Sequence, residues 1–73
     1  MDTIVIAHTI AEAKAEYPTA VAVVTPRSPH AAHGKTAHRI VVLASMRDHP
    51  RRDELVEAAR PALVFRSSEV RFS

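Results

Sequence analysis

The 73-residue sequence contains no cysteine, and this absence removes two common means of stabilising a small domain. The chain can form neither a disulfide nor a metal site built on thiolates, which fits a reducing compartment. It also lacks any apolar run close to the roughly 20 residues that a membrane-spanning helix requires. No basic region precedes the first apolar stretch, so we expect a cytoplasmic protein without a signal peptide and without a membrane partner.

Aromatic residues are almost as scarce as cysteine. The chain has one Tyr, two Phe and no Trp, which is little surface for stacking the bases of single-stranded nucleic acid. Ten Lys and Arg stand against eight Asp and Glu, and the resulting net charge of +2 is small for a DNA-binding protein. Nucleic acid is therefore kept only as an alternative partner.

What the chain does contain is a set of short apolar runs that are typical of buried β-strands. The run at 39–45 has five uninterrupted apolar residues, as in a central strand of a parallel sheet whose two faces are covered. Two similar runs, at 3–7 and 20–25, are rich in β-branched residues. The alternating residues 69–72 predict a short edge strand.

The first expected helix follows the first strand. Thr9 and Glu12 have the spacing of a capping box, which predicts a helix that begins there and ends at Pro18. Ile10 and Ala13 lie on the stripe that should face the sheet.

A second helix is expected over residues 49–60. Asp48 is the predicted N-cap, and Pro50 falls in the first turn, where its missing N–H costs nothing. Pro61 should stop or kink this helix. Residues 26–38 read as a connection with one helical turn near 29–33.

The element order is thus β-α-β-loop-β-α-β, within a single domain that spans residues 1–73. This order predicts a small α/β fold with a mostly parallel three- to four-stranded sheet, about two helices and right-handed crossovers. Strand orders 2-1-3-4 and 1-2-3-4 both remain open. In either order two helices are too few to cover every apolar strand face, so we expect a homo-oligomer. The alternative is that residues 26–38 fold over the gap.

Two sequence patterns resemble a phosphate-binding site and a metal site, but neither is predicted to function as one. Gly34-Lys35-Thr36 matches the end of a phosphate-binding P-loop, but a strand follows it, whereas a P-loop lysine must open a helix. His30, His33 and His38 lie close together, but no Asp or Glu occurs between Glu16 and Asp48, so solvated loop histidines are preferred over a metal site.

The carboxyl ends of the predicted strands carry the sharper hypothesis, because ligands of open parallel sheets bind beyond these ends. Cations in the first turn of a helix are disfavoured by the helix dipole, and Arg51 and Arg52 fall in the first turn of the second expected helix. We therefore expect a phosphate, nucleotide or acidic surface at this edge. The candidate residues are Thr9, Arg27, Arg47, Arg51 and Arg52. The alternative is that these arginines are solvated, with Glu54 offsetting Arg51.

Three segments carry a resemblance to known proteins: VAVVTPRS, HGKTAHRIVVLAS and HPRRDELVEAARPAL. They resemble small uncharacterised α/β proteins of actinobacterial phages, which combine a TP strand end, a Gly before a VVVL-type strand and a proline-started EL helix. The chain is also similar to the middle of a helicase-like P-loop core. Ala44-Ser45-Met46 stands where that core has its metal-binding Walker B acid, and Walker A is missing, so the resemblance implies shape rather than ATP hydrolysis.

These features together predict a non-enzymatic protein-interaction module that forms homo-oligomers and needs no cofactor or metal. The phage resemblance implies a host or phage protein as its partner, in the cytoplasm of the host cell. The alternative is a nucleic-acid- or anion-binding accessory protein that uses the arginine-rich edge. Salt separates the two, because contacts to phosphates weaken steeply as salt rises whereas an apolar interface is nearly indifferent.

Overall fold

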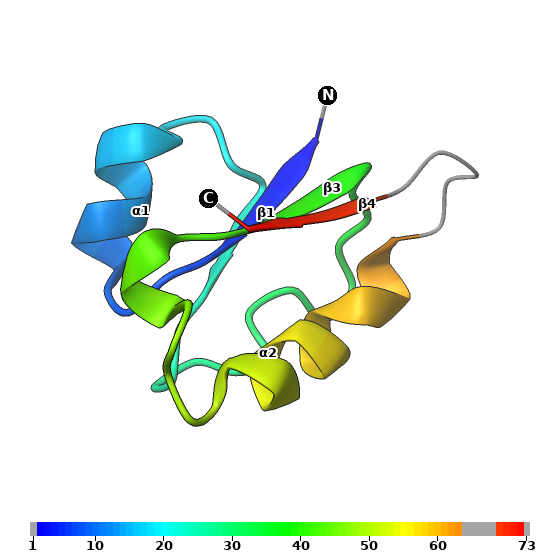
Figure 1. Cartoon of the computed structure of the whole chain (residues 1–73). Coiled ribbons are helices and arrows are strands. Elements are labelled where there is room, and N and C mark those ends of the chain that lie inside the picture. Colours follow the sequence, from blue (N-terminus) through cyan, green and yellow to red (C-terminus); the bar gives the residue numbers. More distant parts are fainter. Residues whose placement is uncertain (1, 64–68, 73) are drawn as a thin grey trace.

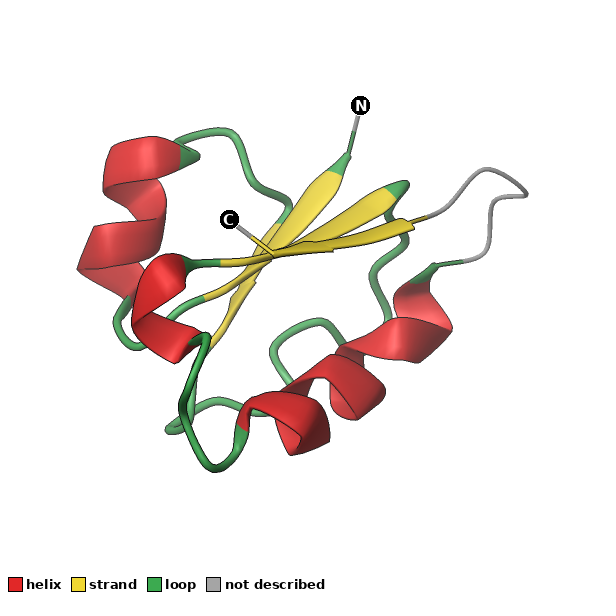
Figure 2. Cartoon of the chain, in the orientation of Figure 1, coloured by secondary structure: helices red, strands yellow, loops and turns green. Residues whose placement is uncertain are grey.

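The computed structural model of the chain describes residues 2–63 and 69–72. Its elements follow the predicted order, with two short 3-10 turns added (Figures 1 and 2). They are β1 (Thr3–Ile6), α1 (Ile10–Glu16), β2 (Ala22–Val24), β3 (Arg39–Val42), η1 (Ala44–Met46), α2 (Arg52–Ala59), η2 (Arg60–Ala62) and β4 (Glu69–Phe72).

The four strands form one sheet in the order β2-β1-β3-β4, and all three neighbouring pairs are parallel. The predicted α/β class and the small parallel sheet are therefore confirmed. Of the two strand orders that the sequence left open, the structure has 2-1-3-4. The chain runs outward from β1 to β2, crosses back to β3 and ends at β4, so the direction of strand addition reverses at β1.

Helices cover both faces of this sheet, which gives three layers (Figure 1). On one face Ala13 of α1 packs against Val5 and Val41. On the other face Leu55 of α2 packs against Ile6 and Ile40. Because successive strand residues point to opposite faces, the uninterrupted apolar runs serve two cores at once.

The expectation of uncovered strand surface is wrong for the two central strands, β1 and β3. All residues of β1 and β3 except the first of each are at most 2% exposed. The connection between β2 and β3 helps to cover the α2 face, because its Ala32 and Ala37 belong to the same core as α2. On the opposite face β4 presents Glu69 and Arg71, which need no apolar cover. The alternative reading, a connection folded over the gap, is the one observed.

Several predicted boundaries need correction. The predicted strand at 39–45 ends at Val42, because the chain turns into η1 at Ala44. Asp48 is not the N-cap of α2; Arg51 takes that position, since a turn in which the Arg52 N–H donates to the His49 carbonyl comes first.

Two further local expectations differ from the structure. Ile10 was expected to face the sheet, but 49% of it is exposed, because it begins α1 beyond the end of β1. Residues 29–33 form successive turns rather than a turn of helix. Pro61 does interrupt the helix as expected, since α2 gives way to the 3-10 turn η2 there. Among the described residues, no helix is long and apolar enough to cross a bilayer.

Candidate functional site: a cavity beyond β1 and β2

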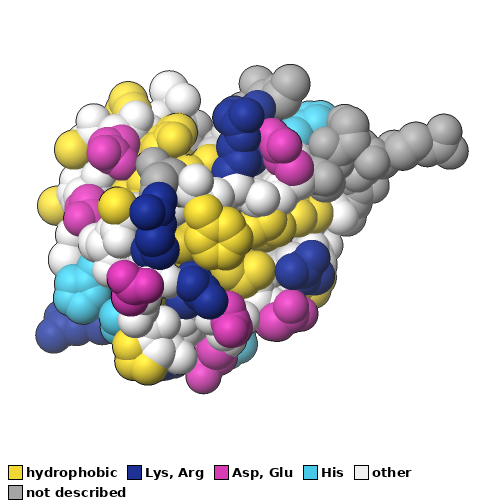
Figure 3. Space-filling model, in the orientation of Figure 1, with side chains coloured by type: hydrophobic (Ala, Val, Ile, Leu, Met, Phe, Trp, Pro, Cys, Tyr) yellow, Lys and Arg dark blue, Asp and Glu magenta, His cyan; other side chains and the backbone are white. Residues whose placement is uncertain are grey.

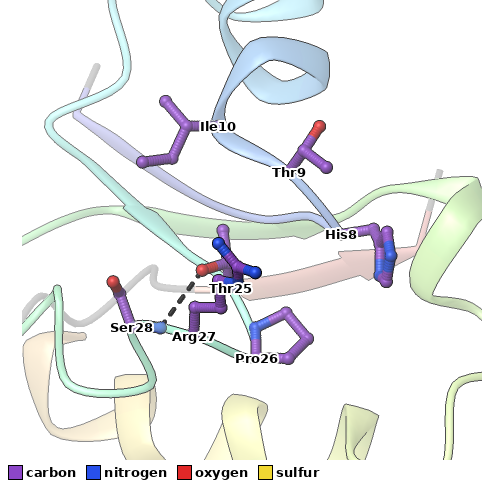
Figure 4. Close-up of a pocket in the computed structure, with 7 residues that line it drawn as sticks. All are labelled: His8, Thr9, Ile10, Thr25, Pro26, Arg27 and Ser28. Atoms are coloured by element: carbon purple, nitrogen blue, oxygen red, sulfur yellow. Dashed lines mark hydrogen bonds between the residues drawn. The ribbon is translucent and has the colours of Figure 1, made fainter.

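The parallel pairing brings the carboxyl ends of three strands to one edge of the sheet. The Ala7 N–H donates to the Val24 carbonyl at 3.0 Å, and the Leu43 N–H donates to the Ile6 carbonyl at the same distance. The segments after β1 and β2 diverge from this edge and enclose a cavity of about 460 Å³. Its lining residues are His8, Thr9, Ile10, Thr25, Pro26, Arg27 and Ser28 (Figure 4).

One wall of the cavity is a tight turn after β2. The Ser28 N–H donates both to the Thr25 carbonyl, at 2.9 Å, and to the Thr25 hydroxyl, at 3.2 Å. Thr25 is buried, at 4% exposure, whereas Arg27 and Ser28 are exposed. Pro26 occupies the second position of the turn, which its fixed φ favours. The turn therefore anchors itself through Thr25 and places the exposed Arg27 side chain at the cavity (Figure 4).

The opposite wall is the entry into α1. The Thr9 hydroxyl accepts the Glu12 N–H at 3.2 Å, which confirms this half of the predicted capping box. The Glu12 carboxylate accepts a hydrogen bond from the Ser45 hydroxyl and so ties α1 to η1. Glu12 is thereby directed toward η1, and no carboxylate belongs to the lining of the cavity.

His8 links the cavity to the segment after β3. Its ring lies against that of His49, with 5.8 Å between the centroids. His49 Nδ1 in turn accepts the Arg51 N–H at 3.1 Å. The connections that follow β1 and β3 are thus in contact next to the cavity.

The structure brings together only two of the five residues predicted for anion binding. Thr9 and Arg27 line the cavity from opposite walls. Arg51 stands behind the β2 turn, where its Nη1 donates to the Pro26 carbonyl at 2.9 Å. Its remaining contacts go to Glu54, with Nη2 at 2.6 Å and Nε at 3.1 Å from the same carboxylate oxygen. The predicted offset of Arg51 by Glu54 is therefore present.

Arg47 and Arg52 lie outside the cavity lining as well. Arg52 donates to the Arg47 carbonyl, pairs with Asp53 at 3.1 Å, and places its guanidinium 5.4 Å from the centre of the Phe72 ring. Arg52 is thus directed toward β4. Binding of an anion at the predicted group stays a prediction, but its arginines do not form one cluster.

Arg27 differs from the other described arginines in its contacts. Five of the seven have an ion pair, and Arg47 also has an interaction: the five are Arg39, Arg51, Arg52, Arg60 and Arg71. Within residues 2–63 and 69–72, Arg27 has neither a hydrogen bond nor an ion pair. A guanidinium carries five N–H donors in a fixed fork, so this arginine keeps its full capacity for a ligand.

Sequence reasoning missed Ser28 and the exposed Ile10 as parts of this site. The signal for Ser28 was present, because Thr25-Pro26-Arg27-Ser28 has the composition of a tight turn with Pro at its second position. A local signal for the exposure of Ile10 does not exist, since the same apolar residue would suit a buried helix stripe.

The two rejected motifs lie elsewhere. Gly34, with φ of 80°, ends a turn, and the segment 34–36 lines a separate hollow of about 360 Å³ beside Ala58 and Pro61. That hollow is at the C-terminal end of α2, where a helix presents carbonyl groups and disfavours phosphate. In the described part of the chain, no group of three or more His, Cys, Asp or Glu residues is placed to hold a metal ion.

No family model, curated protein or solved structure matches this chain. The resemblances to phage proteins and to a helicase-like core therefore stay predictions, and functional inference depends on the geometry of the site.

Proposed function

We propose that this chain binds a small molecule bearing a phosphate or carboxylate group in the cavity beyond β1 and β2. The observation that carries the proposal is the state of Arg27, which has no hydrogen bond or ion pair to the described residues and lines a cavity of about 460 Å³. A cavity wall with an arginine and without a carboxylate attracts an anion and repels a cation.

Hydroxyl groups on both walls supply further donors. The Thr9 hydroxyl oxygen accepts the Glu12 N–H, and its own hydrogen remains available to donate. Ser28 adds a second hydroxyl beside Arg27. A guanidinium fork matches two oxygens of a phosphate or carboxylate, so Arg27 is the main contact and the hydroxyls orient the group.

The cavity is larger than a bare anion needs. Its volume of about 460 Å³ lies within the usual range for small-molecule sites. Ile10, with 49% of its surface exposed, and Pro26 provide apolar contact beside the charged group. We therefore propose an organic anion with an apolar portion rather than inorganic phosphate as the preferred ligand.

A small anion is favoured over a polyanion because Arg27 is the one arginine among the described residues that lines the cavity. Duplex or single-stranded nucleic acid would engage several cations along a surface, and two other arginines at this edge, Arg51 and Arg52, already contact Glu54, Asp53 or backbone carbonyls. The salt slope distinguishes the two. A single phosphate contact gives a slope near −1, whereas a nucleic-acid footprint gives a slope several times steeper.

Docking to a host or phage protein remains the other candidate from the sequence. Its main argument was uncovered strand surface, and little of it is present, since Phe72 is the one exposed large hydrophobic residue in the described strands. The cavity offers a more specific chemical basis than this surface does.

Isothermal titration calorimetry with inorganic phosphate and phenyl phosphate tests the proposal. We expect phenyl phosphate to bind more tightly, and Arg27→Ala to weaken both ligands by about tenfold or more, which corresponds to one lost charged contact. Arg60→Ala is the matched control, because this exposed arginine contacts Glu57 outside the cavity. Equal affinity of the two variants, or no binding by the wild type, would contradict the proposal.

A further inference from the structure

The outer edge of β4 has backbone groups without a neighbouring strand among residues 2–63 and 69–72. In the sheet of these residues β4 is the last strand and pairs with β3 alone. The Glu69 N–H donates to the His38 carbonyl at 3.2 Å, so Glu69 and Arg71 direct their backbone groups toward β3. Val70 and Phe72, which alternate with them, direct their N–H and C=O groups away from the sheet. This edge is therefore ready to accept a further strand.

The side chains of β4 divide between the two faces of the sheet. Val70 is in register with Ile40, and Phe72 with Val42, so both lie on the α2 face. Glu69 and Arg71 lie on the α1 face. There the Glu69 carboxylate is 3.1 Å from Arg39 Nε and 3.6 Å from Arg71 Nε. The edge thus carries an acid and a base two positions apart on one face and apolar side chains on the other.

We propose that two copies of this chain pair antiparallel through β4, around a twofold axis at Val70. In this register the outward N–H and C=O of Val70 face those of the partner's Val70 and form a hydrogen-bonded pair. Glu69 then lies opposite the partner's Arg71, and Arg71 opposite the partner's Glu69. These are non-hydrogen-bonded positions, where opposite side chains approach closely and opposite charges stabilise the pair.

The charge pattern selects this register over its neighbour. An axis at Arg71 instead pairs the outward backbone groups of Val70 with those of the partner's Phe72, but it sets Arg71 directly opposite the partner's Arg71, and like charges at such positions are destabilising. The sequence of one acid and one base around Val70 is self-complementary under a twofold axis, as an isologous interface requires.

The apolar side chains of β4 also favour a second copy of this chain as the partner. Phe72 is 53% exposed, and with Val70 and Val56 it lines a groove of about 210 Å³ between β4 and α2. Figure 3 shows hydrophobic side chains gathered on this side of the molecule, flanked by acidic and basic ones. In the proposed register Phe72 is the diagonal neighbour of the partner's Val70, within reach of an aromatic side chain. A second copy therefore covers the exposed ring.

A charge-swap experiment tests the register. Sedimentation equilibrium of the wild type should show a concentration-dependent dimer, since a strand of four residues gives a small interface. Arg71→Glu and Glu69→Arg each place like charges opposite one another, and each alone should weaken dimerisation by about tenfold or more. An equimolar mixture of the two variants restores opposite charges at both positions and should form a heterodimer.

Val70→Pro is the complementary variant. It removes an N–H that points away from β3 and leaves the donors of Glu69 and Arg71 in place, so the dimer should dissociate while the circular dichroism spectrum stays native. A wild type that is monomeric at millimolar concentration, single variants that dimerise unchanged, or a mixture that stays monomeric would overturn the proposal. Phenyl phosphate binding by Val70→Pro should equal that of the wild type, which separates this interface from the cavity.

Discussion

Arg27 and Arg51 lie at the same edge of the sheet, next to the turn of residues 25–28 that follows β2. They differ in their contacts, because the Arg51 side chain is hydrogen-bonded and that of Arg27, among the described residues, is not. Arg51 donates to the Pro26 carbonyl from behind the turn and holds Glu54 with two nitrogens. Arg27 belongs to the same turn but lines the cavity, and the lining contains no carboxylate. One arginine stabilises the wall, and the other is left for a ligand. Position at the carboxyl edge is therefore a weaker guide to a binding residue than the state of its hydrogen-bond donors.

The largest effect that we expect from these two arginines is a loss of ligand affinity when Arg27 is replaced. Arg27→Ala should lower the affinity for phenyl phosphate by about 10- to 100-fold, because a charged hydrogen bond contributes about 1.5–3 kcal/mol. The free energy of unfolding should change by less than about 0.5 kcal/mol, as for a surface side chain without a structural contact. Calorimetric titration and urea denaturation measure the two quantities. A stability loss as large as the binding loss would mean that Arg27 is structural.

Arg51→Ala should show the reverse pattern. Loss of the bonds to the Pro26 carbonyl and to Glu54 should lower the free energy of unfolding by about 1–2 kcal/mol, because one of these acceptors is a half-buried backbone group. Glu54→Ala is the matched control, since it removes the ion pair and leaves the bond to Pro26 intact. Urea denaturation of the two variants separates these contributions. Equal losses would show that the contact with the turn contributes nothing.

A smaller effect is expected where α1 is tied to η1. Ser45→Ala removes the hydrogen bond to the Glu12 carboxylate and should cost about 0.5–1 kcal/mol, because the pair is exposed to water. Glu16→Ala serves as the control, because Glu16 is an exposed carboxylate on α1, the helix that also carries Glu12. If Ser45→Ala is also neutral in thermal denaturation, η1 does not help to position the α1 wall.

The smallest effect is expected for the ion pair of Arg39 and Glu69. Both side chains are partly exposed, at 29% and 46%, so their coupling energy should be about 0.2–1 kcal/mol. A double-mutant cycle with Arg39→Ala and Glu69→Ala at low protein concentration measures it in the monomer. A coupling of several kcal/mol would contradict this estimate.

The fold class was predictable from the sequence because its signals are local. Uninterrupted β-branched runs predicted buried parallel strands, Thr9 predicted the start of α1, and the alternation at 69–72 predicted β4. The strand order was not predictable, since both candidate orders satisfy the same pattern. Coverage of the α2 face by Ala32 and Ala37 was not predictable either, because small apolar residues in a proline-rich connection have no periodicity.

The site was only half predictable for a similar reason. Parallel strands place Thr9 and Arg27 at one edge, and this follows from topology alone. That Arg51 is engaged depends on its approach to the Pro26 carbonyl, 25 positions earlier in the chain. Such a contact leaves no trace in spacing or composition. The arginines therefore formed one group in the sequence, whereas in the structure Arg27 stands apart from the others.

The most direct test of the central claim is a titration of the ¹⁵N-labelled protein with phenyl phosphate, followed by amide chemical shifts. We expect saturable shifts of the amides of residues 8–10, 25, 27 and 28, which line the cavity from both walls, and their loss in Arg27→Ala. Shifts centred on Arg51 and Arg52 instead, or shifts that persist unchanged in Arg27→Ala, would contradict the assignment of Arg27 as the ligand-binding arginine.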